Sequence, residues 1–184
     1  TYDGGVDDYG ANAFTIMGND NSLLNNYISG AWAYSSDFGW NGGACEMFNT
    51  CNRNKIMYNT FVDCEGISEY GGQGGASHVA NDNLIAYNKI INCGSLVWQN
   101  MSGPFAMQGS NLKFYNNVVV ENNLSRFSGP NTGLGNSHPL AQYPATRLFG
   151  YSGNSNASTV IDLKNNIFIQ GTGISIINSN QAST

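Results

Sequence analysis

The chain has 184 residues, a net charge of −5, and only 10% charged residues. Hydrophobic residues make up 41% and aromatic residues 12%, which excludes intrinsic disorder, and the scarcity of Ala, Glu, Lys and Leu argues against a helical bundle. The 7 Lys and Arg residues cannot form the basic surface that nucleic acid binding needs, and no apolar run reaches the ~18 residues of a membrane span.

A repeated segment of alternating apolar residues recurs along the chain. Its five copies are NSLLNNYISG (21–30), NKIMYNTFVDC (54–64), NLIAYNKIINC (83–93), NLKFYNNVVVEN (111–122) and TVIDLKNNIFIQG (159–171). Aligning the copies places an Asn at one shared position, followed two or three residues later by apolar residues. These asparagines are Asn25, Asn59, Asn88, Asn116 and Asn165.

Two weaker rows of short segments flank this repeat. One row precedes it (13–17, 44–48, 76–80, 104–108, 146–150) and another follows it (32–36, 66–70, 95–99, 124–128). Alternation at period two and a high content of Val, Ile, Phe and Tyr predict β-strands. Three sequential strands in each repeat of about 28 residues predict an all-β parallel β-helix of about five to six coils. We expect residues 1–184 to form a single domain, with a long insertion at 128–146.

The repeated Asn has a physical role in such a fold. A sharp corner between strands leaves backbone groups unpaired, and a buried unpaired amide costs ~1–3 kcal/mol. An inward Asn carries both a donor and an acceptor, and it tolerates the left-handed backbone angles of corners. Stacked coils therefore predict an inward Asn ladder, in which each Asn binds its equivalent one coil away at the strand spacing of ~4.8 Å.

The Asn row, the three-strand coil and the N-x-[IVF]-[IVF] pattern resemble the right-handed parallel β-helix superfamily of pectate lyases and their relatives. The resemblance covers residues 12–178, and residues 44–70 resemble generic β-helix repeat modules of secreted bacterial carbohydrate-active proteins. It implies a right-handed coil and a polysaccharide partner. The chain lacks the catalytic motifs of pectate lyases and of polygalacturonases, so no catalytic residue is transferred from those families.

The four cysteines have two interpretations. Cys64 and Cys93 each lie five residues after their aligned Asn, so they should stack on adjacent coils as a buried Cys ladder or as a disulfide. Cys45 and Cys51 flank a corner that a disulfide could bridge. Their spacing does not fit a zinc site.

Three tyrosines each precede an aligned Asn and should point outward in a column: Tyr58, Tyr87 and Tyr115. This column predicts either an aromatic stack that stiffens the sheet or a platform for sugar rings.

Charged side chains within predicted strands are informative because charge is rare in this chain. The best catalytic candidates are Glu46, Glu69, His78 and Arg147. Glu46 and Glu69 suit glycoside hydrolysis by paired carboxylates, with Asp37 a third candidate. His78 or Arg147 suits proton abstraction in β-elimination from a uronate sugar, which also needs a cation or metal.

A side groove along the coils would suit a linear polysaccharide, and its expected binding residues are Asp37, Trp40, Tyr70, Trp98, Gln99, Arg126 and His138. Calcium is the one candidate cofactor, at Asp3, Asp7 and Asp8 of the DGGVDD loop.

The composition, rich in Asn, Gly, Ser and Tyr, favours a secreted protein. We expect this protein to bind an extracellular polysaccharide and, if it is an enzyme, to cleave it. Five or six coils are few for a complete enzyme of this fold, so we expect a part of a larger protein or assembly. The alternative is a non-catalytic structural or adhesive segment of a surface or fibre protein.

Overall fold

The computed structural model describes residues 11–31, 33–35, 39–71, 78–100, 108–121, 147–152, 161–171 and 175–179. These residues form strands joined by short corners, and no helix occurs among them. The strands are β1 (Ala11–Ile16), β2 (Ser22–Leu24), β3 (Tyr27–Ser29), β4 (Ala33–Ser35), β5 (Gly39–Phe48), β6 (Lys55–Met57), β7 (Thr60–Val62), β8 (Gly66–Gly71), β9 (Val79–Asn81), β10 (Leu84–Ala86), β11 (Lys89–Ile91), β12 (Ser95–Asn100), β13 (Gln108–Ser110), β14 (Leu112–Tyr115), β15 (Val118–Glu121), β16 (Arg147–Ser152), β17 (Ile161–Lys164), β18 (Ile167–Gln170) and β19 (Ser175–Ser179).

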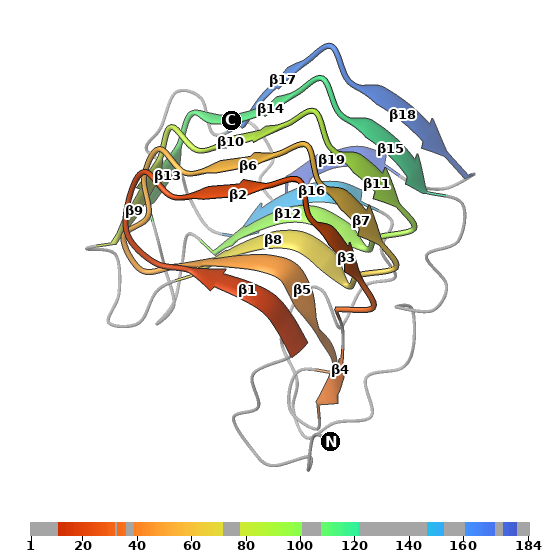
Figure 1. Ribbon diagram of the computed structural model, residues 1–184, viewed down its shortest axis with the longest axis horizontal. Helices are drawn as coiled ribbons and strands as arrows, with labels where there is room; N and C mark the ends of the chain where they lie inside the picture. Colours follow the sequence, from red (N-terminus) through yellow and green to blue (C-terminus); the bar gives the residue numbers. More distant parts are fainter. Residues whose placement is uncertain are drawn as a thin grey trace.

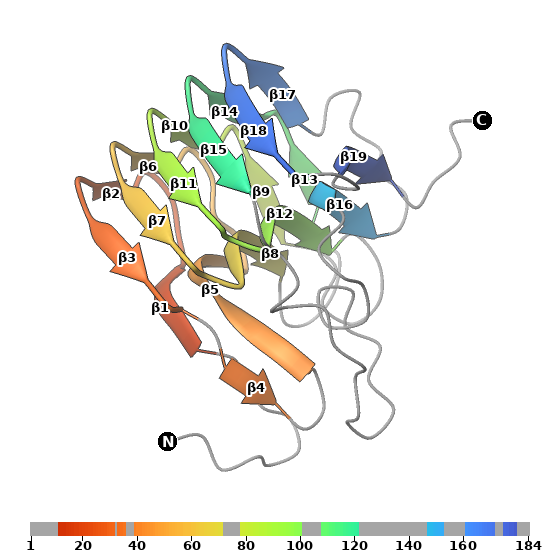
Figure 2. The same cartoon turned by 90° about the vertical axis from the view of Figure 1, so that its right-hand side faces the viewer.

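The strands assemble into three large sheets that the chain visits in turn (Figures 1 and 2). Sheet A has the order β1-β5-β8-β12-β16-β19, sheet B the order β2-β6-β10-β14-β17, and sheet C the order β3-β7-β11-β15-β18. A two-stranded sheet, β9-β13, lies between sheets A and B along the chain. Neighbouring strands in all four sheets are parallel, and β4 alone adds an antiparallel pairing, to β5.

We call one passage through sheets A, B and C a coil. Strand residues pair with their equivalents on the next coil, as Ile56 pairs with Ile85 and Phe61 with Ile90. The parallel sheets and buried asparagines are compatible with the expected parallel β-helix. The assignment of rows was wrong in one respect, because residues 44–48 and 66–70, expected in different rows, pair in sheet A. The Asn segment instead supplies two sheets, since the chain bends in its middle.

Apolar side chains at equivalent positions fill the space between the sheets. Sheet B contributes Leu23, Ile56, Ile85 and Phe114, and sheet C contributes Ile28, Phe61, Ile90 and Val119, all buried. Their outward-facing neighbours along each strand are mostly part-exposed or exposed. Strand alternation at period two therefore builds a continuous column of core residues from coil to coil.

A buried Asn ladder crosses the corner between sheets B and C. Asn88 accepts bonds at its Oδ1 from the backbone N–H of Asn59 (2.9 Å) and the Nδ2 of Asn59 (3.1 Å). Its own Nδ2 donates to the Ile56 carbonyl (2.9 Å) and to Asn117 Oδ1 (3.0 Å). The same pattern joins all five members, which are Asn26, Asn59, Asn88, Asn117 and Asn166.

The ladder was predicted one residue early on three coils. Asn25, Asn116 and Asn165 are not ladder members but hold the left-handed position that precedes each ladder Asn, with φ of 58°, 54° and 54°. Tyr58 and Tyr87 occupy this position on the two coils between them, with φ of 59° and 58°. The corner thus needs two residues with different tasks. The first bends the chain through its left-handed backbone conformation, and the second forms hydrogen bonds with the buried backbone groups.

Two of the three expected tyrosines form a stack. The rings of Tyr58 and Tyr87 lie 5.2 Å apart at 15°, and both side chains are about half exposed. Tyr115 is one position out of register, because it pairs with Ala86 and Lys164. The stacked rings cover each other's faces, which favours stiffening of the corner over a flat sugar platform.

Replacing Tyr87 with Asn tests the cost of this stack. Asn accepts the left-handed conformation more readily than Tyr, whose side chain makes it unfavourable by roughly 1–2 kcal/mol. Loss of the stack removes about 0.5–1.5 kcal/mol. We expect Tyr87→Asn to change the free energy of unfolding by less than about 1 kcal/mol in urea titrations, and a loss well above that would show that the stack holds the coils together.

Candidate functional site

Sheet A brings the two predicted catalytic glutamates together. Glu46 of β5 pairs directly with Glu69 of β8, and Glu69 pairs in turn with Trp98 of β12. Thr15 precedes Glu46 in the same row. Since neighbouring strands lie ~4.8 Å apart, this row brings two carboxylates from distant parts of the sequence onto adjacent coils.

The alternation of burial shows which way the two glutamates point. Cys45 and Met47, on either side of Glu46, are fully buried, and Tyr70, beside Glu69, is 1% exposed. Glu46 and Glu69 themselves are part-exposed, so they lie on the outer face of sheet A. The prediction that Tyr70 faces a groove was wrong, because adjacent residues of a strand face opposite sides and Glu69 takes the outer side.

A hydrogen bond positions the carboxylate of Glu46. Asn12 Nδ2, from β1, donates to Glu46 Oε2 at 2.8 Å. The negative charge of Glu69 adds to the effect of burial in raising the pKa of Glu65, which lies in the interior.

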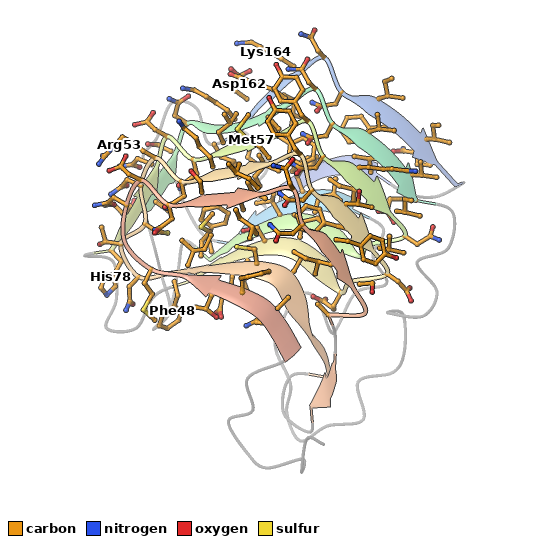
Figure 3. The ribbon with its side chains drawn as sticks, viewed as in Figure 1. Phe48, Arg53, Met57, His78, Asp162 and Lys164 are labelled. Atoms are coloured by element: carbon orange, nitrogen blue, oxygen red, sulfur yellow. The ribbon has the colours of Figure 1, made fainter. Side chains whose placement is uncertain are left out.

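The other two catalytic candidates lie elsewhere. His78 precedes β9, with its Nδ1 3.5 Å from Thr50 Oγ1, on the side of the molecule that carries Phe48 and Arg53 (Figure 3). Arg147 begins β16 and pairs with Ser175. Arg147 lies three residues before Gly150, and Gly150 is the residue that pairs with Trp98. The four candidates therefore divide into a glutamate pair and two separate residues.

The predicted binding residues are only partly described. The backbone of Trp40 lies in β5 opposite Tyr34, and that of Gln99 lies in β12 opposite Tyr70. Asp37, Arg126 and His138, together with the 128–146 insertion and the DGGVDD loop, lie outside the described residues.

Two buried carboxyl groups were not predicted from the sequence. Glu65 and Glu121 are 1% and 0% exposed, and the Oε2 atom of each has no hydrogen-bond partner among the described residues. Glu121 Oε1 accepts the backbone N–H of Cys93 at 3.0 Å. Burial raises the pKa of Glu121 to about 9, so Glu121 is protonated at neutral pH, and burial also raises the pKa of Glu65 well above its usual range. The one sequence signal is the position of Glu121 at the end of the apolar run VVVE.

All four cysteines are buried and unbridged. Cys64 and Cys93 lie on adjacent coils, as predicted, where the Gly94 backbone N–H donates to the Cys64 carbonyl at 2.9 Å. Burial raises the pKa of Cys51 to about 12 and that of Cys45 higher still. Neither predicted disulfide is present in this structure.

Two ion pairs lie on the surface, one on the outer face of sheet B and one at the corner that precedes this sheet. Asp162 accepts hydrogen bonds from Tyr115 Oη (2.5 Å) and Lys164 Nζ (2.8 Å) on β17, the last strand of sheet B (Figure 3). Arg53 pairs with Asp20 at 2.7 Å. Among the described residues, no group of three or more His, Cys, Asp or Glu side chains is placed to hold a metal ion.

Comparisons with known proteins leave the family open. The chain matches no protein-family model, and no curated protein and no solved structure gives a significant match. None of the segments described in the structure is a helix long and apolar enough to cross a membrane. The geometry of sheet A is therefore the main indication of function.

Proposed function

We propose that the chain is a right-handed parallel β-helix, similar to the pectate lyase superfamily, that binds and cleaves an extracellular polysaccharide on the outer face of sheet A. The observation that carries this proposal is the pairing of Glu46 and Glu69 on adjacent coils, with both side chains on the outer face. A linear polymer repeats along its length, as the coils do. Secretion accords with the low charge and the Asn- and Gly-rich composition.

Hydrolysis by a retaining mechanism fits the pair best. Retaining glycosidases place two carboxyl groups ~5–5.5 Å apart, and neighbouring strands at ~4.8 Å permit that separation. The Asn12 bond favours the charged form of Glu46, which makes Glu46 the nucleophile. In this mechanism Glu69 is the general acid, which protonates the oxygen of the leaving sugar.

β-Elimination is the less favoured reaction. It needs a cation beside the sugar carboxylate and a base at the adjacent carbon. His78 and Arg147 are the residues suited to those tasks, but neither belongs to the glutamate row.

Incubation with a panel of neutral and acidic polysaccharides tests the proposal. We expect new reducing ends without absorbance from unsaturated uronates. Glu46→Gln and Glu69→Gln should each lower the rate by at least ~10²-fold, the usual contribution of acid–base catalysis. Asp162→Asn, which alters a carboxylate on sheet B, is the matched control and should retain full activity.

Three outcomes would contradict this mechanism. Unsaturated products would indicate elimination, and full activity of both Gln variants would exclude the pair. No product and no retention on any glycan would overturn the function itself.

A non-catalytic structural role is the second candidate, and one observation favours it. Sheet C exposes apolar side chains on its outer face, including Tyr27 (69%), Ile167 (56%) and Ile169 (54%). Exposed apolar surface is common at sites of association. Trimers or filaments in light scattering, unchanged in Glu46→Gln and Glu69→Gln, would support this role in place of catalysis.

A further inference from the structure

Cys64 and Cys93 occupy the same place on successive coils. Each lies two residues beyond a strand of sheet C, after a residue with a left-handed backbone, Asp63 (φ 60°) or Asn92 (φ 48°). Val62 and Ile91 pair directly, so the two cysteines are in register. Neighbouring parallel strands lie ~4.8 Å apart, within the ~4.4–6.8 Å between Cα atoms that a disulfide spans.

The two thiols are both fully buried, but their pKa values shift in opposite directions. A hydrogen bond with the Cys93 thiol lowers the pKa of Cys64. Burial raises the pKa of Cys93 well above its usual range. The two thiols point at equivalent carbonyls, Cys64 at Val62 (3.6 Å) and Cys93 at Ile91 (3.5 Å). The lower pKa makes Cys64 the better nucleophile, which leaves Cys93 for the second step.

We infer that Cys64 and Cys93 are an oxidisable pair that a hydroperoxide converts into a disulfide between adjacent coils. In the first step, the Cys64 thiolate attacks one peroxide oxygen, the O–O bond breaks, and the leaving oxygen departs as water after protonation. Cys64 is then a sulfenic acid. In the second step, the Cys93 sulfur attacks the sulfenic sulfur, the S–O bond breaks, and the hydroxyl leaves as water with the Cys93 proton. Overall, two thiols and one hydrogen peroxide give one disulfide and two waters.

The other cysteine pair is an internal comparison. Cys45 and Cys51 are equally buried, but they lie on one coil, and no hydrogen bond between their thiols lowers the pKa of either. We therefore expect them to stay reduced in the folded protein. The Cys64–Cys93 bond would close a loop of 29 residues (93 − 64) and restrict the unfolded chain.

Hydrogen peroxide treatment of the folded, reduced chain tests the inference. Trypsin cleaves after Arg53, Lys55, Lys89 and Lys113, so Cys64 and Cys93 fall in separate peptides, 56–89 and 90–113, and Cys45 and Cys51 share a third, 1–53. We expect the two single-cysteine peptides to become linked, two of the four thiols to be lost, and the mass to fall by two hydrogens. The melting temperature should rise and return to its starting value with a thiol reductant.

Variants separate the pair from general oxidation. Cys64→Ala and Cys93→Ala should abolish the linked peptides, whereas Cys51→Ala, the matched control, should leave them intact. The inference is overturned if folded wild-type protein keeps all four thiols under peroxide, or if Cys45 and Cys51 are lost as fast as Cys64 and Cys93. Because the wild-type digest already decides between these results, the test holds even if an Ala variant fails to fold.

Discussion

Replacing Asn88 with Ala should destabilise the protein by about 4 kcal/mol, a large part of the ~5–15 kcal/mol of a typical domain. The substitution removes four hydrogen bonds at a buried site. It leaves the Asn59 backbone N–H and the Ile56 carbonyl without these partners, and each buried unpaired group costs ~1–3 kcal/mol. The shift of the urea midpoint at constant slope measures the change.

Asn26→Ala is the matched control at the end of the ladder. Asn26 is part-exposed, and among the described residues its Nδ2 donates to Asn59 Oδ1 and to the Leu24 carbonyl. We expect a loss of only about 1 kcal/mol, because water replaces the missing partners. Equal losses for Asn26→Ala and Asn88→Ala would contradict the account of the ladder as a buried network.

Replacing Glu121 with Gln should stabilise the protein by about 3 kcal/mol at pH 7. The pKa of Glu121 is about 9 in the folded chain and ~4.3 in the unfolded one. Between these values the folded state holds a proton that the unfolded state has released, so stability falls as pH rises. Gln keeps the acceptor for the Cys93 N–H but has no ionisable proton, which removes this slope.

Unfolding measured from pH 4 to pH 9 gives the test. The stability of Glu121→Gln and of wild type should converge near pH 4 and separate with rising pH. Asp20→Asn is the control, because its pH dependence has the opposite sign. The hydrogen bond from Arg53 lowers the pKa of Asp20, so this contact stabilises the fold at neutral pH and is lost as the pH falls through the range where Asp titrates. A difference between Glu121→Gln and wild type that stays constant with pH would show that Glu121 is not protonated in the folded state.

The strands and the Asn corners of this fold could be predicted from sequence, but their exact register could not. Three corners read Asn-Asn (25–26, 116–117, 165–166), so the alignment took the first Asn where the second belongs to the ladder. The Tyr-Asn corners at 58–59 and 87–88 carried no such ambiguity. Both Asn positions have a physical use, and only the hydrogen bonds between coils distinguish them.

The candidate site was predictable to the same degree. Rarity of charge identified Glu46 and Glu69, and their direct pairing follows from sheet A. The sequence placed them in different rows, because loops of unequal length concealed that residues 44–48 and 66–70 pair in one sheet. Tyr70 was misplaced because adjacent residues of a strand face opposite sides, and Glu69 already faces outward. Glu65 and Glu121 were not predicted because carboxyl groups usually lie on the surface, whereas these two are buried.

The corner between sheets B and C always contains two residues, whereas the connections on either side of sheet A vary in length. A chain built in this way can gain or lose residues beside sheet A without moving any residue of the ladder. Loops of new length or sequence could therefore be grafted on both borders of the Glu46–Glu69 face, which makes that face the part of the molecule whose ligand can be redesigned while its scaffold stays the same.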